Sequence, residues 1–237
     1  MDDLNALRLA GLVGLVGSVL YSAGDVLLLA PTAAEHRPRQ PLPVDVSQDR
    51  VLRRRVTLLE NLACLPPWRL RWGALLGVMG APLTVAGLWL FYRGVLPAGP
   101  WTAVPPTILF LGVAVVGPFV HGSFAYVGET VQLLYEVEEV HRVSLVSRVR
   151  GQVVALMLAY VPLLLAAIIA SALAAAATVS GGTRFPPWMG AVNPVTMTVG
   201  WLLVKRGLPT PAAEFLQGAG FNIAYGAWFA AMTMTVQ

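Results

Sequence analysis

The chain has 237 residues, of which 57% are hydrophobic and only 12% are charged, and its mean hydropathy is +0.69. A soluble domain carries roughly 25% charged residues, so this composition excludes an ordinary soluble globular protein and indicates that lipid surrounds most of the apolar surface. The net charge of +4 does not indicate nucleic-acid binding, because the basic residues lie between apolar segments, where positive charge reports membrane orientation.

Six apolar segments approach the ~20 residues that a spanning helix needs. The fifth is short and contains Asn193-Pro194, which predicts a break in that helix. We therefore predict an all-α polytopic membrane bundle that forms one transmembrane domain over residues 1–237. In chain order the predicted spans run from about Asn5 to Ala30, Trp72 to Leu96, Pro106 to Leu134, Val149 to Val179, Pro187 to Val204 and Pro211 to Val236.

The first predicted span carries Gly11, Gly14, Gly17 and Gly24. Small residues repeated along a membrane helix let a neighbouring helix approach closely, so we interpret these glycines as packing residues.

The longest connection, residues 31–71, follows the first span. Its second part, about 46–65, places Leu52, Val56, Leu59 and Ala63 at i, i+4, i+7 and i+11, which predicts an amphipathic helix. We expect this helix to lie in the cytoplasmic interface, with its arginines near lipid phosphates. An anchor that sets orientation is the favoured interpretation of these arginines, and a specific phosphate site is the alternative.

Basic residues are distributed unevenly over the two sides of the predicted bundle. The connections after the first, third and fifth spans hold eight arginines, then Arg142, Arg148 and Arg150, then Lys205 and Arg206. The other side keeps only Arg8, Arg93 and Arg184. Positive residues concentrate in cytoplasmic loops, so the sequence predicts that both termini lie outside the cytoplasm.

Three ionisable side chains inside predicted spans stand out: Asp25 in the first, and His121 and Glu129 in the third. Such residues cost at least ~2.5 kcal/mol each at the bilayer centre, so they normally face a cavity or a partner. An eight-residue spacing places His121 and Glu129 about 80° apart around the helix axis. We predict these three as catalytic residues; the alternative is that Asp25 and Glu129 reach the interface and pair with a loop arginine.

Further polar and aromatic side chains come to similar depths on other spans, which predicts a cavity that opens toward the cytoplasm. We expect them to contact a substrate, and they are Tyr21, Tyr126, Asn193, Gln217, Phe221, Asn222 and Tyr225. A metal or cofactor site is not expected, because Cys64 and the scattered His36, His121 and His141 form no ligand motif and no phosphate-binding loop is present.

Several of these residues stand in short motifs that together resemble a bacterial six-helix membrane family catalogued only as a domain of unknown function. The motifs are Gly24-Asp25-Val26-Leu27-Leu28, Arg71-Trp72-Gly73-Ala74-Leu75, Pro118-Phe119-Val120-His121-Gly122-Ser123-Phe124, Trp188-Met189 with Asn193-Pro194, and Gly218-Ala219-Gly220-Phe221-Asn222. The resemblance covers nearly the whole chain and implies the same architecture in a bacterial cytoplasmic membrane, with no known activity.

The leading functional hypothesis is a metal-free membrane enzyme that acts by acid–base chemistry on a lipophilic substrate, such as a lipid or an isoprenoid, as a terpenoid cyclase or isomerase would. The alternatives are a small-solute or proton-coupled carrier and a non-catalytic membrane binding protein. The expected partners are membrane lipids and a hydrophobic small molecule, with homo-oligomerisation as an option and no nucleic acid.

Overall fold

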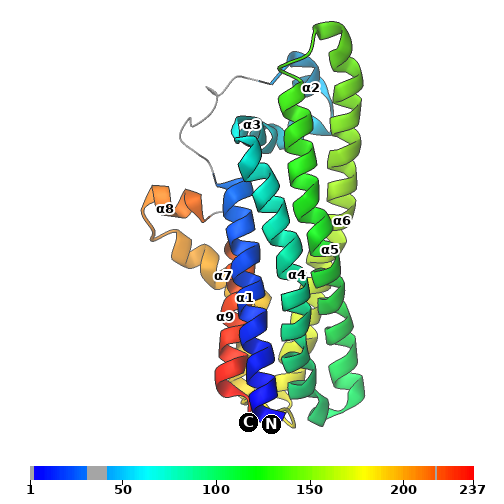
Figure 1. The fold of residues 1–237 in the computed structure, drawn as a ribbon. Coiled ribbons are helices and arrows are strands. Elements are labelled where there is room, and N and C mark those ends of the chain that lie inside the picture. Colours follow the sequence, from blue (N-terminus) through cyan, green and yellow to red (C-terminus); the bar gives the residue numbers. More distant parts are fainter. Residues whose placement is uncertain (1–2, 31–41, 217) are drawn as a thin grey trace.

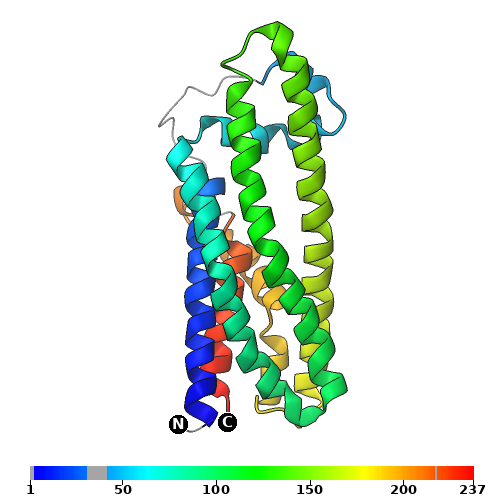
Figure 2. The ribbon, with the colours of Figure 1, turned by 45° about the vertical axis from the view of Figure 1, so that its right-hand side comes forward.

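The computed structural model describes residues 3–30, 42–216 and 218–237, and all regular structure in these residues is helical (Figures 1 and 2). Within this described part, four helices are long and apolar enough to cross a membrane. They are α1 (Asp3–Leu29), α4 (Pro67–Val95), α5 (Pro100–Leu133) and α6 (Glu139–Val179). The predicted helical bundle is thereby confirmed in its class.

The four long helices run alternately up and down, and α5 and α6 extend beyond α1 and α4 at one end (Figures 1 and 2). Their lengths of 34 and 41 residues exceed the 27 and 29 residues of α1 and α4. The chain segment 42–65 packs on this extension. The protruding end of α5 and α6 therefore carries a second apolar core, separate from the core of the bundle.

The two predicted C-terminal spans are each divided in the structure. The fifth consists of η3 (Pro187–Ala191) and α7 (Pro194–Lys205), and the sixth of α8 (Thr210–Phe215) and α9 (Gly220–Thr235). At 1.5 Å per residue, α7 and α9 are about 18 and 24 Å long, which is less than the ~30 Å hydrocarbon core. The break predicted at Asn193-Pro194 is confirmed.

The segment predicted as one amphipathic helix over about 46–65 is also divided, into α2 (Val44–Gln48), η1 (Leu52–Arg55) and α3 (Val56–Cys64). The division occurs at Asp49, whose Oδ1 accepts hydrogen bonds from the backbone N–H of Val51 at 2.8 Å and of Leu52 at 3.1 Å. The bond from Leu52 is the main cause that lowers the pKa of the Asp49 carboxyl below its usual range. A local side-chain turn has therefore replaced the continuous helix.

The apolar side of this segment packs on protein. Leu52, Leu59 and Leu62 are fully buried in a cluster with residues of α5 and α6, such as Val131 and Val153. A helix in the membrane interface would instead turn these leucines into lipid. The 3.6-residue periodicity correctly marked the buried side but not what covers it.

Glycines let α1 and α4 pack closely along their length, as predicted. A Cβ atom on Gly17 would lie 2.9 Å from the Gly80 carbonyl oxygen, and one on Gly24 would lie 2.7 Å from that of Gly73. These backbone contacts leave no space for side chains at the crossing. The helices are antiparallel, so the contacts follow one another in opposite order along the two chains.

Arg69 satisfies the carbonyl groups at the C-terminal end of α1. Its Nε donates to Leu27 O at 3.0 Å, and its Nη2 donates to Val26 O at 2.9 Å and to Ala30 O at 3.2 Å. The last four carbonyls of a helix have no partner within the helix, so a buried arginine supplies the missing donors.

We expect Arg69→Met to lower the free energy of unfolding by about 2–4 kcal/mol, because it leaves buried carbonyls without donors. Arg71→Met is the matched control, because Arg71 is exposed and its ion pair with Glu129 contributes at most about 1 kcal/mol. Thermal unfolding in detergent compares the two variants. Equal losses of stability would contradict the role given to Arg69.

Candidate functional site

A cavity lies inside the bundle between α1, α4, α5, α6 and the start of α9. About 120 Å³ of it is open to the centres of water-sized molecules, whereas roughly 10–15 Å³ suffices for one water. The walls are mainly apolar and aromatic, and polar groups come from several helices. The lining residues are Ser18, Tyr21, Asp25, Leu29, Thr84, Phe110, Val113, Ala114, Gly117, Val120, His121, Phe124, Tyr160, Leu163, Gly218, Phe221, Asn222 and Tyr225.

Three polar side chains from three helices meet in this cavity. Asn222 Nδ2 on α9 donates a hydrogen bond to Asp25 Oδ2 on α1 at 2.6 Å. The other carboxyl oxygen of Asp25 lies 3.5 Å from His121 Nε2 on α5, and both side chains are at least nine-tenths buried. Asp25 therefore has two polar neighbours. The amide of Asn222 fixes the orientation of its carboxyl group, and the imidazole of His121 can exchange a proton with it.

Glycines on two neighbouring helices, α4 and α1, make room for His121. A Cβ atom on Gly77 of α4 would overlap the imidazole ring, and one on Gly24 would lie 3.4 Å from His121 Nδ1. The Nδ1 atom has no hydrogen-bond partner of standard geometry among the described residues, although the Gly73 backbone interacts with the ring. The glycine contacts of α1 and α4 thus also position the imidazole.

A proline in α5 explains the position of Tyr21. Pro118 has no N–H, so the carbonyl of Ala114, four residues earlier, loses its helical donor. The hydroxyl of Tyr21 on α1 donates to this carbonyl at 3.4 Å. The Tyr21 ring also lies 5.0 Å from that of His121, centroid to centroid. The proline therefore supplies an acceptor that holds an aromatic ring beside the imidazole.

Aromatic side chains close the cavity at the end nearer the two chain termini. Phe110, Tyr225 and Trp228 pack with ring centroids 4.9–6.1 Å apart, and Tyr225 also contacts Phe221 and Phe229. The Tyr225 hydroxyl is buried without a hydrogen-bond partner in the described structure. A buried hydroxyl in this state is costly, so it is a natural contact for a polar group of a ligand or for water.

The structure brings six of the ten predicted site residues into this one cavity. They are Tyr21, Asp25, His121, Phe221, Asn222 and Tyr225. Gln217 lies outside the described residues.

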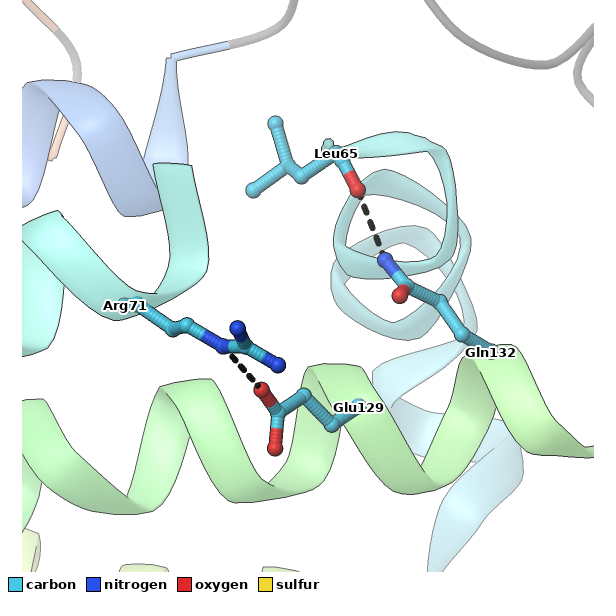
Figure 3. A network of polar contacts seen from close by, with 4 residues as sticks. All are labelled: Leu65, Arg71, Glu129 and Gln132. Carbon is cyan, nitrogen blue, oxygen red and sulfur yellow. Dashed lines mark hydrogen bonds and ion pairs between the residues drawn. The ribbon is translucent and has the colours of Figure 1, made fainter. Parts of the chain in front are cut away.

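Glu129 was predicted as a catalytic residue of the same cavity, and the structure places it elsewhere. Its side chain is 39% exposed and its Oε1 lies 3.1 Å from Arg71 Nε (Figure 3). Close by on α5, Gln132 donates to the carbonyls of Leu62 at 3.3 Å and Leu65 at 2.7 Å. This end of α5 contacts the start of α4 and the end of α3. Glu129 therefore pairs with an arginine, as the alternative expected, but this arginine lies in the first turns of α4 and not in a loop.

Tyr126 and Asn193 also lie away from the cavity. Tyr126 is 66% exposed, because it projects from the outer side of α5. Asn193 caps α7: its side chain accepts from the backbone N–H of Val195 and Thr196, each at 3.1 Å, and donates to Gly190 O. The buried amide of Asn193 therefore has a structural role at the helix break.

Several lining residues were not predicted from the sequence. Tyr160 on α6 lies in a uniformly apolar stretch of sequence. Its hydroxyl group is the one signal in that stretch that could have identified it as a lining residue. Ser18 and Thr84 also line the cavity, but each bonds a carbonyl four residues back in its own helix, as small hydroxyls in apolar helices do.

The arrangement is suited to acid–base chemistry. In the described part of the chain, no three or more His, Cys, Asp or Glu side chains come together as a metal site would require. An oriented carboxyl beside an imidazole is the usual apparatus for moving a proton to or from a bound molecule.

Comparison with known proteins agrees with the resemblance in the short motifs. No curated protein and no solved structure gave a match. A family model described as "Family of unknown function (DUF6796)" matches residues 1–237. The chain therefore belongs to this family.

Proposed function

We propose that the protein is a membrane-embedded enzyme that binds a lipophilic molecule in the cavity and acts on it by acid–base chemistry. The observation that carries this proposal is the buried pair of Asp25 and His121 on the wall of an otherwise apolar, aromatic cavity. Intramembrane ionisable residues are costly and are usually retained for function. Apolar walls with a few convergent polar groups are typical of small-molecule sites.

The proposed chemistry is an isomerisation or cyclisation. A proton added to the substrate at one atom is recovered from another atom, so the acid is regenerated and no co-reactant is consumed. Asp25 delivers or accepts the proton, His121 exchanges it with Asp25, and Asn222 holds the carboxyl in one orientation. The proposed substrate class is lipophilic in general, and a terpenoid cyclase or isomerase reaction is one member of it.

The aromatic packing favours an enzyme over a carrier. A carrier needs a path that reaches both faces of the membrane, whereas the rings of Phe91, Phe110, Trp228 and Phe229 pack together below the cavity. The hydrogen bond between Asn222 and Asp25 favours a second candidate, a non-catalytic protein whose polar residues join α9 to α1.

An assay for product formation tests the proposal. The purified protein in lipid nanodiscs is incubated with an extract of non-polar lipids, and the extract is compared by liquid chromatography and mass spectrometry before and after. The proposal predicts a new species that has the mass of one component and a different retention time. An unchanged extract from every lipid source tried would count against an isomerising enzyme.

We also propose six membrane crossings in a bacterial cytoplasmic membrane, with both termini outside. In this arrangement the chain from η3 to α7 and the chain from α8 to α9 are the fifth and sixth crossings, each interrupted. The two termini lie at the same end of the bundle, as an even number of crossings requires (Figure 1). At this end Asp3 pairs with Arg93 at 3.4 Å and with Arg184 at 3.0 Å. These ion pairs further reduce the positive charge at this end of the bundle.

Cysteine accessibility tests this orientation. In a Cys64→Ala background, Ser180→Cys at the end of α6 should react with a membrane-impermeant thiol reagent in intact cells. Ser144→Cys, at the opposite end of the same helix, should react only after the cells are permeabilised. Both serines are exposed in the structure. The reverse pattern of labelling would overturn the orientation.

A further inference from the structure

The cavity is elongated along the bundle axis. Its lining on α1 runs from Ser18 to Leu29, which lie eleven positions apart, or about 16 Å at 1.5 Å per residue. We call the end of the cavity that points toward the segment 42–65 the loop-side end. The residues that line it include Leu29 on α1, Phe124 on α5 and Tyr160 on α6. Tyr160 is 37% exposed, whereas Phe110 and Tyr225 at the other end are buried, so this end is the more open one. A long space with apolar walls fits an alkyl or isoprenoid chain better than a compact molecule.

An arginine from the segment before α3 lies next to this end of the cavity. Arg55, at the end of η1, places its Nη2 atom 3.1 Å from the Sδ atom of Met157 on α6. Met157 precedes Tyr160 by three residues, so the two side chains are neighbours on one side of α6. Both Arg55 and Asp25 are close enough to Tyr160 to interact with it electrostatically.

Within the described residues, no carboxylate pairs with Arg55. A thioether sulfur is a weak acceptor. Met157 packs against both the core of the bundle and the core under α3, so Arg55 lies at the boundary between them. A guanidinium beside the open end of an apolar cavity is well placed to bind a carboxylate or phosphate with two parallel hydrogen bonds.

We propose that the ligand of the cavity is a lipophile with a single anionic head group, carboxylate or phosphate, which Arg55 binds at the loop-side end while the apolar chain extends past Asp25 and His121. This inference rests on the proposed function and specifies its substrate class. The chain of the ligand, rather than its head group, then lies beside the proton-transferring pair. Double bonds within the chain are then the groups that the acid protonates.

Binding of three probes with the same C16 chain tests the proposal: palmitate, hexadecyl phosphate and hexadecanol. Apparent Kd values are measured by native mass spectrometry on the full chain. The variants are Arg55→Gln and Arg54→Gln, which is a matched control from the same exposed turn. A third variant, Leu163→Trp, places a larger side chain on the wall of the cavity and fills part of its space. Thermal unfolding of each variant confirms that the bundle is intact.

We expect Arg55→Gln to weaken binding of palmitate, hexadecyl phosphate or both by about tenfold or more, the size of a lost charge-assisted contact, and to change hexadecanol by less than about twofold. Whichever anionic probe responds identifies the head group. Arg54→Gln should leave all three unchanged, and Leu163→Trp should weaken all three. Equal losses in Arg54→Gln and Arg55→Gln would show general attraction to a basic surface and would overturn the inference.

Two further outcomes separate this inference from the proposed function. If Leu163→Trp abolishes binding but Arg55→Gln changes nothing, the anionic head group is wrong while a ligand cavity stands. If Leu163→Trp leaves the binding of every probe unchanged, these chains do not enter the cavity, and both the inference and the lipophilic site fail.

Discussion

Asp25→Asn is expected to lower product formation by 10²–10⁴-fold while the fold stays intact, because an amide has no proton of suitable acidity to exchange. The asparagine oxygen still accepts the hydrogen bond that Asn222 Nδ2 donates to Asp25 at 2.6 Å. The contact between α1 and α9 therefore survives, and stability should change by about 1 kcal/mol or less. Turnover in nanodiscs and thermal unfolding in detergent are measured on the same preparations.

Glu129→Gln is the matched control for this variant. It makes the same carboxyl-to-amide change in a membrane helix, but Glu129 is outside the cavity and pairs with the exposed Arg71 (Figure 3). Its turnover should equal that of the wild type. A non-catalytic protein whose polar residues only join helices would show no difference in activity between the two variants, and full activity of Asp25→Asn would refute the proposed acid–base role.

The second large effect is expected at the crossing of α1 and α4. Gly87→Ala should lower the free energy of unfolding by roughly 1–3 kcal/mol, because the added methyl group overlaps the Gly14 backbone and comes within 2.8 Å of Phe229. These contacts involve two other helices, so neither can give way alone. Loss of monodisperse protein after heating in detergent measures the effect.

Gly112→Ala serves as the control for the glycine substitution. Gly112 lies within α5, and a Cβ atom there has nothing within 4 Å. Alanine has the better helix propensity, by up to about 1 kcal/mol, so Gly112→Ala should be neutral or stabilising. If Gly87→Ala were equally tolerated, close backbone contact would not hold α1 against α4.

The sequence predicted the four long helices well because hydropathy reports the solvent of each segment directly. It underestimated the length of α6, which begins at Glu139 instead of about Val149, since its first turns leave the apolar stretch. Those turns pack against the segment 42–65. Hydropathy does not detect a helix stabilised by packing on a second, smaller core. Nor does the amphipathic pattern around Leu52 and Leu59 show that these two leucines pack on protein.

Asp25, His121 and Asn222 were predicted as site residues because a polar group in an apolar helix needs a polar partner. Each of the three had few other polar side chains at its depth with which to pair. Glu129 obeyed the same rule, but its partner Arg71 belongs to a helix whose rotation a single sequence does not specify. Asn193 found its partners within its own turn, as a residue before proline at a helix start commonly does. The position of a residue along its helix predicted the depth of its side chain in the bundle. The packing of the neighbouring helices determines the direction in which that side chain points.

The most direct test of the account is to find where a lipophile binds. A C16 chain with a photoreactive diazirine near its end is added to the protein in nanodiscs, and the cross-linked residues are mapped by peptide mass spectrometry. We predict labelling of cavity residues such as Phe110, Val113 and Phe221, and its loss in Leu163→Trp. Labelling confined to exposed apolar residues on the outside of the bundle, such as Leu9 and Val115, and unchanged in that variant, would contradict a ligand site beside Asp25 and His121.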